Sequence, residues 1–99
     1  MTINKTVNGS DLTVALEGRL DTTTAPELEA FLKDALADAQ TLTFDFEKLE
    51  YISSAGLRVL LSAQKTMNAK DGAMKVTHIC DVIMEIFEVT GFCDILAIE

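Results

Sequence analysis

Residues 44–65, FDFEKLEYISSAGLRVLLSAQK, decide the fold. The phenylalanines of the first part alternate with charged neighbours, a pattern typical of a half-buried strand. The leucines of the second part recur at helical spacing. We therefore expect a strand at 41–49, then a loop, then a helix with Ser53 and Ser54 at its start. Whether these serines only cap the helix or receive a modification is the main question that the sequence raises.

The same two periodicities divide the rest of the chain into alternating elements. The sequence predicts strands at 3–7, 12–16, 41–49, 74–79 and 94–99, and helices at 24–39, 54–69 and 81–90. Thr24 and Glu27 have the spacing of a capping box around Pro26. Asp81 is expected to cap the third helix and Gly91 to end it.

The predicted order is β-β-α-β-α-β-α-β within one domain spanning residues 1–99. Turn residues 8–11 join the first two strands into a hairpin. Later strands alternate with helices, which implies crossover connections. The fold class is therefore α/β, with a mixed sheet, an N-terminal hairpin and helices mainly on one face.

Charge excludes several classes of partner. Sixteen acidic residues against eight basic ones give a formal charge of −8. Nucleic acid and anionic lipid would be repelled, and no apolar run is long enough to insert into a membrane. The N-terminus has no apolar core of a secretory signal, so we expect a cytoplasmic protein.

The candidate catalytic and metal-binding residues are too few for an enzyme or a metal site. His78 and Cys80 are two apart on a predicted strand, short of the three or four ligands that zinc requires. Ser62–Lys65 matches an S-x-x-K pattern without its companion motifs. We expect no enzymatic activity, no metal and no cofactor.

The serine pair allows two interpretations from its position alone. Serine is a common residue at a helix N-terminus, where its side chain caps the free backbone N–H groups. The same free groups and the helix dipole also favour a phosphate. Ala55 and Gly56 have little bulk, so an approaching active site could reach the serines.

Three segments resemble the signatures of STAS domains, and the resemblance covers nearly the whole chain. Gly18–Asp21 (GRLD) resembles the first signature, residues 42–61 the central one and Phe87–Phe92 (FEVTGF) the third. The branch that the sequence resembles is that of the single-domain bacterial anti-sigma factor antagonists.

This resemblance implies a phosphorylation switch with Ser54 as the acceptor. The unphosphorylated form would bind an anti-sigma factor that is also a serine kinase with a histidine-kinase-like ATPase fold, and so free a sigma factor for transcription. Phosphorylation would abolish binding, and a PP2C-type phosphatase would restore it. Asp21 matches an aspartate beside the phosphorylation loop. The partner-binding residues are expected to be Asp21, Ser53, Ser54, Gly56, Leu57 and Arg58.

The sequence departs from this family at two points. Ser53 stands where the best-known members have aspartate, which leaves it as an alternative acceptor. Many members also carry a helix after the last strand, and little sequence remains here for one. An alternative function is a cytoplasmic STAS subunit of a lipid or anion transport system without a phosphorylation switch. A third hypothesis for the function is an enzyme that hydrolyses nucleotides.

Overall fold

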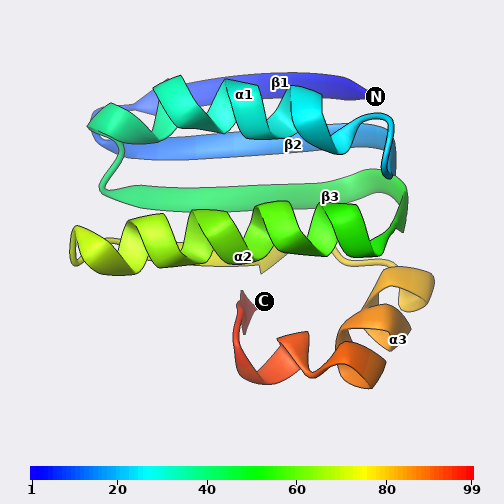
Figure 1. Ribbon diagram of the computed structural model, residues 1–99. Helices are drawn as coiled ribbons and strands as arrows, with labels where there is room; N and C mark the ends of the chain where they lie inside the picture. The colour runs from blue at the N-terminus through cyan, green and yellow to red at the C-terminus, as the bar shows by residue number, and fades with distance from the viewer.

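The computed structural model describes all residues, 1–99, and is built around one five-stranded sheet (Figure 1). Its elements are β1 (Thr2–Asn8), β2 (Asp11–Leu20), α1 (Ala25–Ala35), η1 (Leu36–Asp38), β3 (Thr41–Ile52), α2 (Ser54–Ala69), β4 (Ala73–Thr77), α3 (Asp81–Thr90), η2 (Phe92–Asp94) and β5 (Ala97–Ile98), where η marks a short 3₁₀ helix. The predicted order of strands and helices is confirmed, and so is the α/β class.

The strands lie side by side in the order in which they occur in the chain, β1-β2-β3-β4-β5. β1 and β2 form the predicted antiparallel hairpin, which turns at Gly9 with a φ of 65°. β2, β3, β4 and β5 pair in parallel through helical crossovers. The sheet is therefore mixed, as expected.

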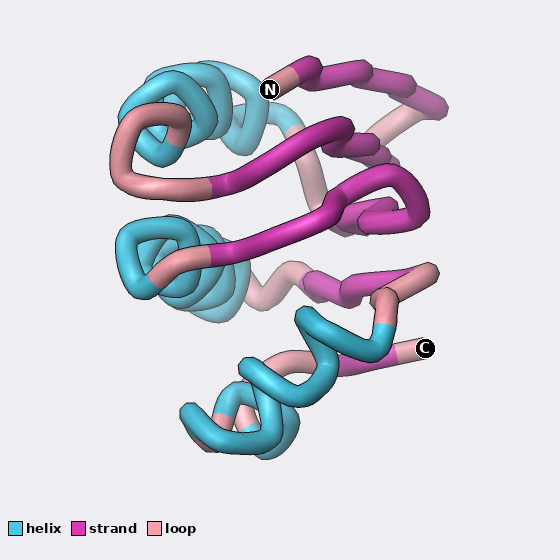
Figure 2. Tube along the Cα trace, turned by 90° about the vertical axis from the view of Figure 1, so that its right-hand side faces the viewer, coloured by secondary structure: helices cyan, strands magenta, loops and turns pink.

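One face of the sheet carries the hydrophobic core. Leu12, Val14 and Leu16 of β2 alternate with half-buried or exposed neighbours, as do the buried residues of β3. Figure 2 shows α1 and α2 together on this side, and α3 adds Ile83 and Phe87 to the same core. The opposite face bears Thr13, Thr43 and other half-buried polar residues. The prediction that helices lie mainly on one face is confirmed.

Lys70, directly after α2, closes the C-terminal end of the first helical segment. Its Nζ donates to the backbone oxygens of Leu36, Ala37 at 3.3 Å and Ala39 at 2.9 Å. Carbonyls at a helix end have no partner within the helix and are stabilised by a cation. A side chain just beyond the end of α2 therefore completes a helical segment that lies more than 30 residues earlier in the chain.

Several predicted boundaries are wrong. β3 continues to Ile52, with no loop before the serines, because parallel pairing with β2 extends to Leu20–Ile52. β4 ends at Thr77, and His78 adopts a φ of 57°, so His78 and Cys80 do not share a strand face. The last strand has only two residues.

Two predicted caps are also wrong, although their helices are present. Thr24 occupies the N-cap position of α1 but makes no capping hydrogen bond with its side chain. Asp81 is the first residue of α3, and Cys80 takes the N-cap position. The predicted end of α3 is confirmed, since Gly91 caps it in the left-handed conformation with a φ of 81°.

Candidate functional site

The candidate site lies where β2 and β3 end beside each other. The backbone N–H of Ser53 donates to Leu20 O at 2.9 Å, which ties the start of α2 to the end of β2. Asp21 follows Leu20 directly. The structure therefore brings together two of the three segments that the sequence singled out, although Leu20 and Ser53 are 33 positions apart in the chain.

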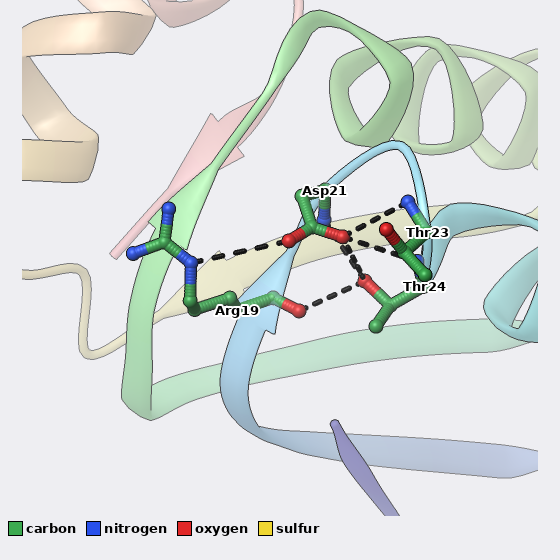
Figure 3. Close-up of polar contacts among 4 residues, drawn as sticks. All are labelled: Arg19, Asp21, Thr23 and Thr24. Atoms are coloured by element: carbon green, nitrogen blue, oxygen red, sulfur yellow. Dashed lines mark hydrogen bonds and ion pairs between the residues drawn. The ribbon is translucent and has the colours of Figure 1, made fainter.

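Asp21 organises the turn between β2 and α1 (Figure 3). Its Oδ1 accepts hydrogen bonds from the backbone N–H of Thr23 at 3.0 Å and of Thr24 at 3.2 Å. These bonds, that to Thr24 first, lower the pKa of the Asp21 carboxyl, against an opposing effect of desolvation. The Thr24 hydroxyl accepts from Asp21 N at 2.9 Å instead of capping α1. The carboxylate is thus ionised at neutral pH and fixed in direction.

Arg19 and Tyr51, which the sequence analysis did not single out, form the rim of the site. The Arg19 guanidinium lies 4.5 Å from the centroid of the Tyr51 ring, and its Nε is 3.9 Å from Asp21 Oδ2. Figure 3 shows the Arg19 side chain reaching to one side of Asp21, with a dashed line joining its Nε to the carboxylate. The GRLD segment contains Arg19, but its stacking depends on the pairing of Arg19 with Tyr51 across two strands. Only that register could have revealed it.

The two serines differ sharply in access. Ser53 occupies the N-cap position of α2 in an extended conformation, and its Oγ is buried with no hydrogen-bond partner. Ser54 is the first helical residue and is exposed. Neither side chain therefore serves as the expected cap, and Ser54 is the one that an enzyme could reach.

The remaining predicted residues divide between the core and the surface. Gly56 and Leu57 are buried, whereas Arg58 is exposed one turn beyond Ser54. A Cβ on Gly56 would lie 2.7 Å from Leu20 Cγ and 2.7 Å from Ile52 Cγ1. Gly56 thus lets α2 approach the two strand ends, and Leu57 anchors it, so neither offers a side chain at the surface.

The residues considered for a metal site or a membrane span lie away from the candidate site. His78 is exposed after β4 and its Nδ1 lies 3.2 Å from Asp45 Oδ1 on the face without helices. No group of three or more His, Cys, Asp or Glu side chains is placed to hold a metal ion. No helix has both the length and the apolar character needed to cross a bilayer.

Comparison with known proteins places these features in a family. Residues 3–97 match the family described as "Mlab, STAS domain". The Bordetella bronchiseptica protein BtrV, named as an anti-sigma factor antagonist, is 32% identical over 88 residues, covering 88% of this chain and 76% of BtrV. The anti-sigma-B factor antagonist of Staphylococcus aureus is 28% identical over 100 residues, which cover all of this chain and 93% of that protein.

The fold is also that of a solved regulator. The anti-sigma factor antagonist SpoIIAA in its unphosphorylated form superposes with a TM-score of 0.79 at 18% identity, covering 99% of this chain and 87% of SpoIIAA. Bacillus SpoIIAA in the phosphorylated form gives a TM-score of 0.78 at 18% identity, covering 99% and 91%. Both forms of that protein therefore share the fold of this chain.

Proposed function

This chain belongs to the STAS domain family, and on that premise we propose that it is an anti-sigma factor antagonist regulated by phosphorylation of Ser54. The names of its relatives support the regulatory role. The single observation that carries the switch is the contrast between an exposed Ser54 and a neighbouring Ser53 whose hydroxyl is buried. Ser54 is therefore the acceptor, and Ser53 is not.

The partner is an anti-sigma factor with serine kinase activity. The Ser54 hydroxyl attacks the γ-phosphorus of ATP bound to the partner, its proton passes to a base of the partner, and ADP leaves. On this chain the product would lie at the N-terminus of α2, where free backbone N–H groups and the helix dipole favour an anion. A PP2C-type phosphatase hydrolyses the phosphate and restores the binding form.

Loss of binding follows from charge at the centre of the docking surface. Asp21 is ionised and lies beside the start of α2. A phosphate on Ser54 adds about −1.5 to −2 charges there. When the partner covers this area, those charges lose water without gaining counter-charges. A penalty of about 3 kcal/mol weakens binding roughly a hundredfold. The switch therefore needs no change of fold.

The docking surface combines exposed and supporting residues. Ser54 and Arg58 contact the partner from α2, and Asp21 contacts it from the adjoining turn. The surface is supported by Ser53, Gly56 and Leu57. They set the position of the first turn of α2 against Leu20 and Ile52. The protein itself is a binding module without enzymatic activity and works in the cytoplasm.

The decisive experiment is phosphorylation by the cognate anti-sigma kinase followed by mass spectrometry of the peptides. We expect phosphate on Ser54 of the wild type and of Ser53→Ala, and none on Ser54→Ala. Calorimetry should show that Ser54→Asp binds the kinase at least tenfold more weakly, equivalent to about 1.4 kcal/mol. Ser62→Asp, which changes an exposed serine two turns further along α2, is the matched control and should bind normally.

Other outcomes point to other functions. Phosphate on Ser53 alone would keep the switch and correct its residue. The switch hypothesis is refuted if Ser54→Asp binds normally and protein isolated from growing and starved cells carries no phosphate. That result would favour the function as a subunit of a transport system. Steady turnover of ATP or GTP by the purified protein would contradict its assignment as a non-enzyme.

A further inference from the structure

α3 exposes apolar side chains that its own packing does not require. Four large hydrophobic residues of the chain are exposed, and three lie on α3 or shortly after it: Val82 at 55%, Val89 at 81% and Ile95 at 47%. Only Ile83 and Phe87 of α3 are buried. Single exposed valines are ordinary on a protein surface. Their arrangement on this helix decides whether they form a surface.

Helical geometry aligns Val82, Ile86 and Val89, which we call the α3 stripe. At about 3.6 residues per turn these three positions fall on one side of the helix. Ile86 is half-buried against the core and joins the stripe to it. Met84 lies across the helix, where its Sδ is 3.9 Å from Cys93 Sγ of η2. The stripe therefore lies on the side of α3 away from η2, with Val82 and Val89 exposed and Ile86 partly covered by the core.

Charge on α3 itself has one sign. Residues 76–99 contain five acidic residues and no lysine or arginine, although one of the five, Glu99, pairs with Lys75 at 2.8 Å. On α3 itself, Asp81, Glu85 and Glu88 are exposed. By helical geometry they border the stripe along the edge opposite the buried face. The stripe is thus an apolar strip with an acidic flank.

We propose that the α3 stripe is a second docking surface, for a protein segment that presents an apolar face flanked by lysine or arginine side chains. Anionic lipid and nucleic acid do not fit, because the acidic flank repels phosphate. Basic side chains would pair with Glu85 and Glu88 while apolar ones cover Val82 and Val89. In Figures 1 and 2, α3 lies apart from α1, near the β4–β5 end of the sheet. This surface acts independently of phosphorylation at Ser54.

The test uses a synthetic amphipathic helix of about 18 residues, or five turns, with leucine on one face and lysine along its flanks. Added to ¹⁵N-labelled full-length protein, it should shift the amide signals of α3 and η2 before those of other elements. The same peptide with serine in place of leucine should bind roughly tenfold more weakly, because the apolar contact is lost. Shifts spread evenly over all acidic surfaces would overturn the proposal.

Matched variants separate the apolar and ionic parts. The double change Val82→Ser and Val89→Ser should weaken binding roughly tenfold. Val7→Ser, which changes a valine on β1 that is 58% exposed against 55% for Val82, should leave binding unchanged. Glu85→Gln with Glu88→Gln should weaken it more than Glu27→Gln with Glu29→Gln on α1, which removes the same charge. If an α3 variant and its control lose the same amount of peptide affinity, the proposed docking surface is refuted.

Phosphorylation distinguishes this surface from the switch. Ser54→Asp should leave peptide affinity unchanged or slightly raised, whereas it weakens binding of the anti-sigma kinase. A loss of about tenfold or more in peptide affinity with Ser54→Asp would show that the stripe belongs to the Ser54 site and would overturn its independence. Binding of vesicles that contain phosphatidylglycerol through Val82 and Val89 would also contradict the proposal.

Discussion

Gly56→Ala tests whether close packing under α2 positions the candidate site. The added Cβ would lie 2.7 Å from Leu20 Cγ, 2.7 Å from Ile52 Cγ1 and 3.0 Å from Leu20 O. Carbon atoms in contact are normally about 3.5–4.0 Å apart, so the neighbours must move by about 1 Å. One of the three atoms is backbone, which limits how far the site can relax.

Two opposing effects set the expected magnitude. Alanine is favoured over glycine within a helix by about 1 kcal/mol, whereas overpacking of a core costs about 1–3 kcal/mol. Because the contacts are short on two sides, the overpacking cost should lie in the upper part of its range, about 2–3 kcal/mol, and the free energy of unfolding should fall by about 1–2 kcal/mol net. For a domain of this size the melting temperature would fall by about 4–16 °C.

Thermal and urea unfolding followed by circular dichroism measure this change directly. Ser62→Ala, an exposed position of α2, gains helix propensity without steric conflict and should be as stable as the wild type or slightly more stable. Gly56→Ala should also bind the proposed anti-sigma factor partner more weakly, because Leu20 precedes Asp21 and Ile52 precedes Ser53. A Gly56→Ala protein that is more stable than the wild type would refute the packing argument.

Three further predictions concern individual side chains. Ser53→Ala should leave the free energy of unfolding unchanged or raise it by up to about 1 kcal/mol, because it removes a buried hydroxyl without a partner; a loss of about 1 kcal/mol in urea titrations would instead indicate a working cap. Lys70→Met should lower the free energy of unfolding by about 1–3 kcal/mol, because three carbonyls lose a charged donor; Lys65→Met, on the exposed side of α2, is its control in the same titrations. The lowered pKa of Asp21 implies that its ionised form stabilises the fold above an unfolded-state pKa of about 3.9 and that this contribution is lost as the pH falls through the lower folded-state value. Asp21→Asn should therefore have a lower free energy of unfolding than the wild type at pH 7. The difference between the two proteins should become smaller below about pH 3.9.

Periodicity predicted the order of elements well, because the buried residues of β2, α1 and β3 follow their strand and helix spacings closely. It missed the extension of β3 through Tyr51 and Ile52, which depends on pairing with Arg19 and Leu20 far away in the chain. The predicted capping box failed for a similar reason. Asp21 accepts a hydrogen bond from the backbone N–H of Thr24, and the Thr24 hydroxyl donates to Arg19 O at 2.8 Å. The Thr24 side chain is therefore not free to cap α1, which local spacing alone could not show.

The candidate site was predicted in part. The segments that form it were identified by resemblance, and Ser54 is exposed as a modification site requires. Spacing could not show that Gly56 and Leu57 face inward or that the Ser53 hydroxyl is buried, because burial depends on how α2 sits against β2 and β3. The Arg19–Tyr51 contact was missed because it joins two strands across a register that contains irregular pairs.

The order of strands in the sheet, which is the order in the chain, has a consequence for synthesis and folding. Each new strand pairs beside the one made just before it, so the sheet can grow from β1 toward β5 as the polypeptide leaves the ribosome. No strand has to wait for a later one to insert between two neighbours. β5 joins last and by only two residue pairs, Lys75 with Ala97 and Val76 with Ile98. Amide protons of this final strand should therefore exchange with solvent well before those of β2 and β3.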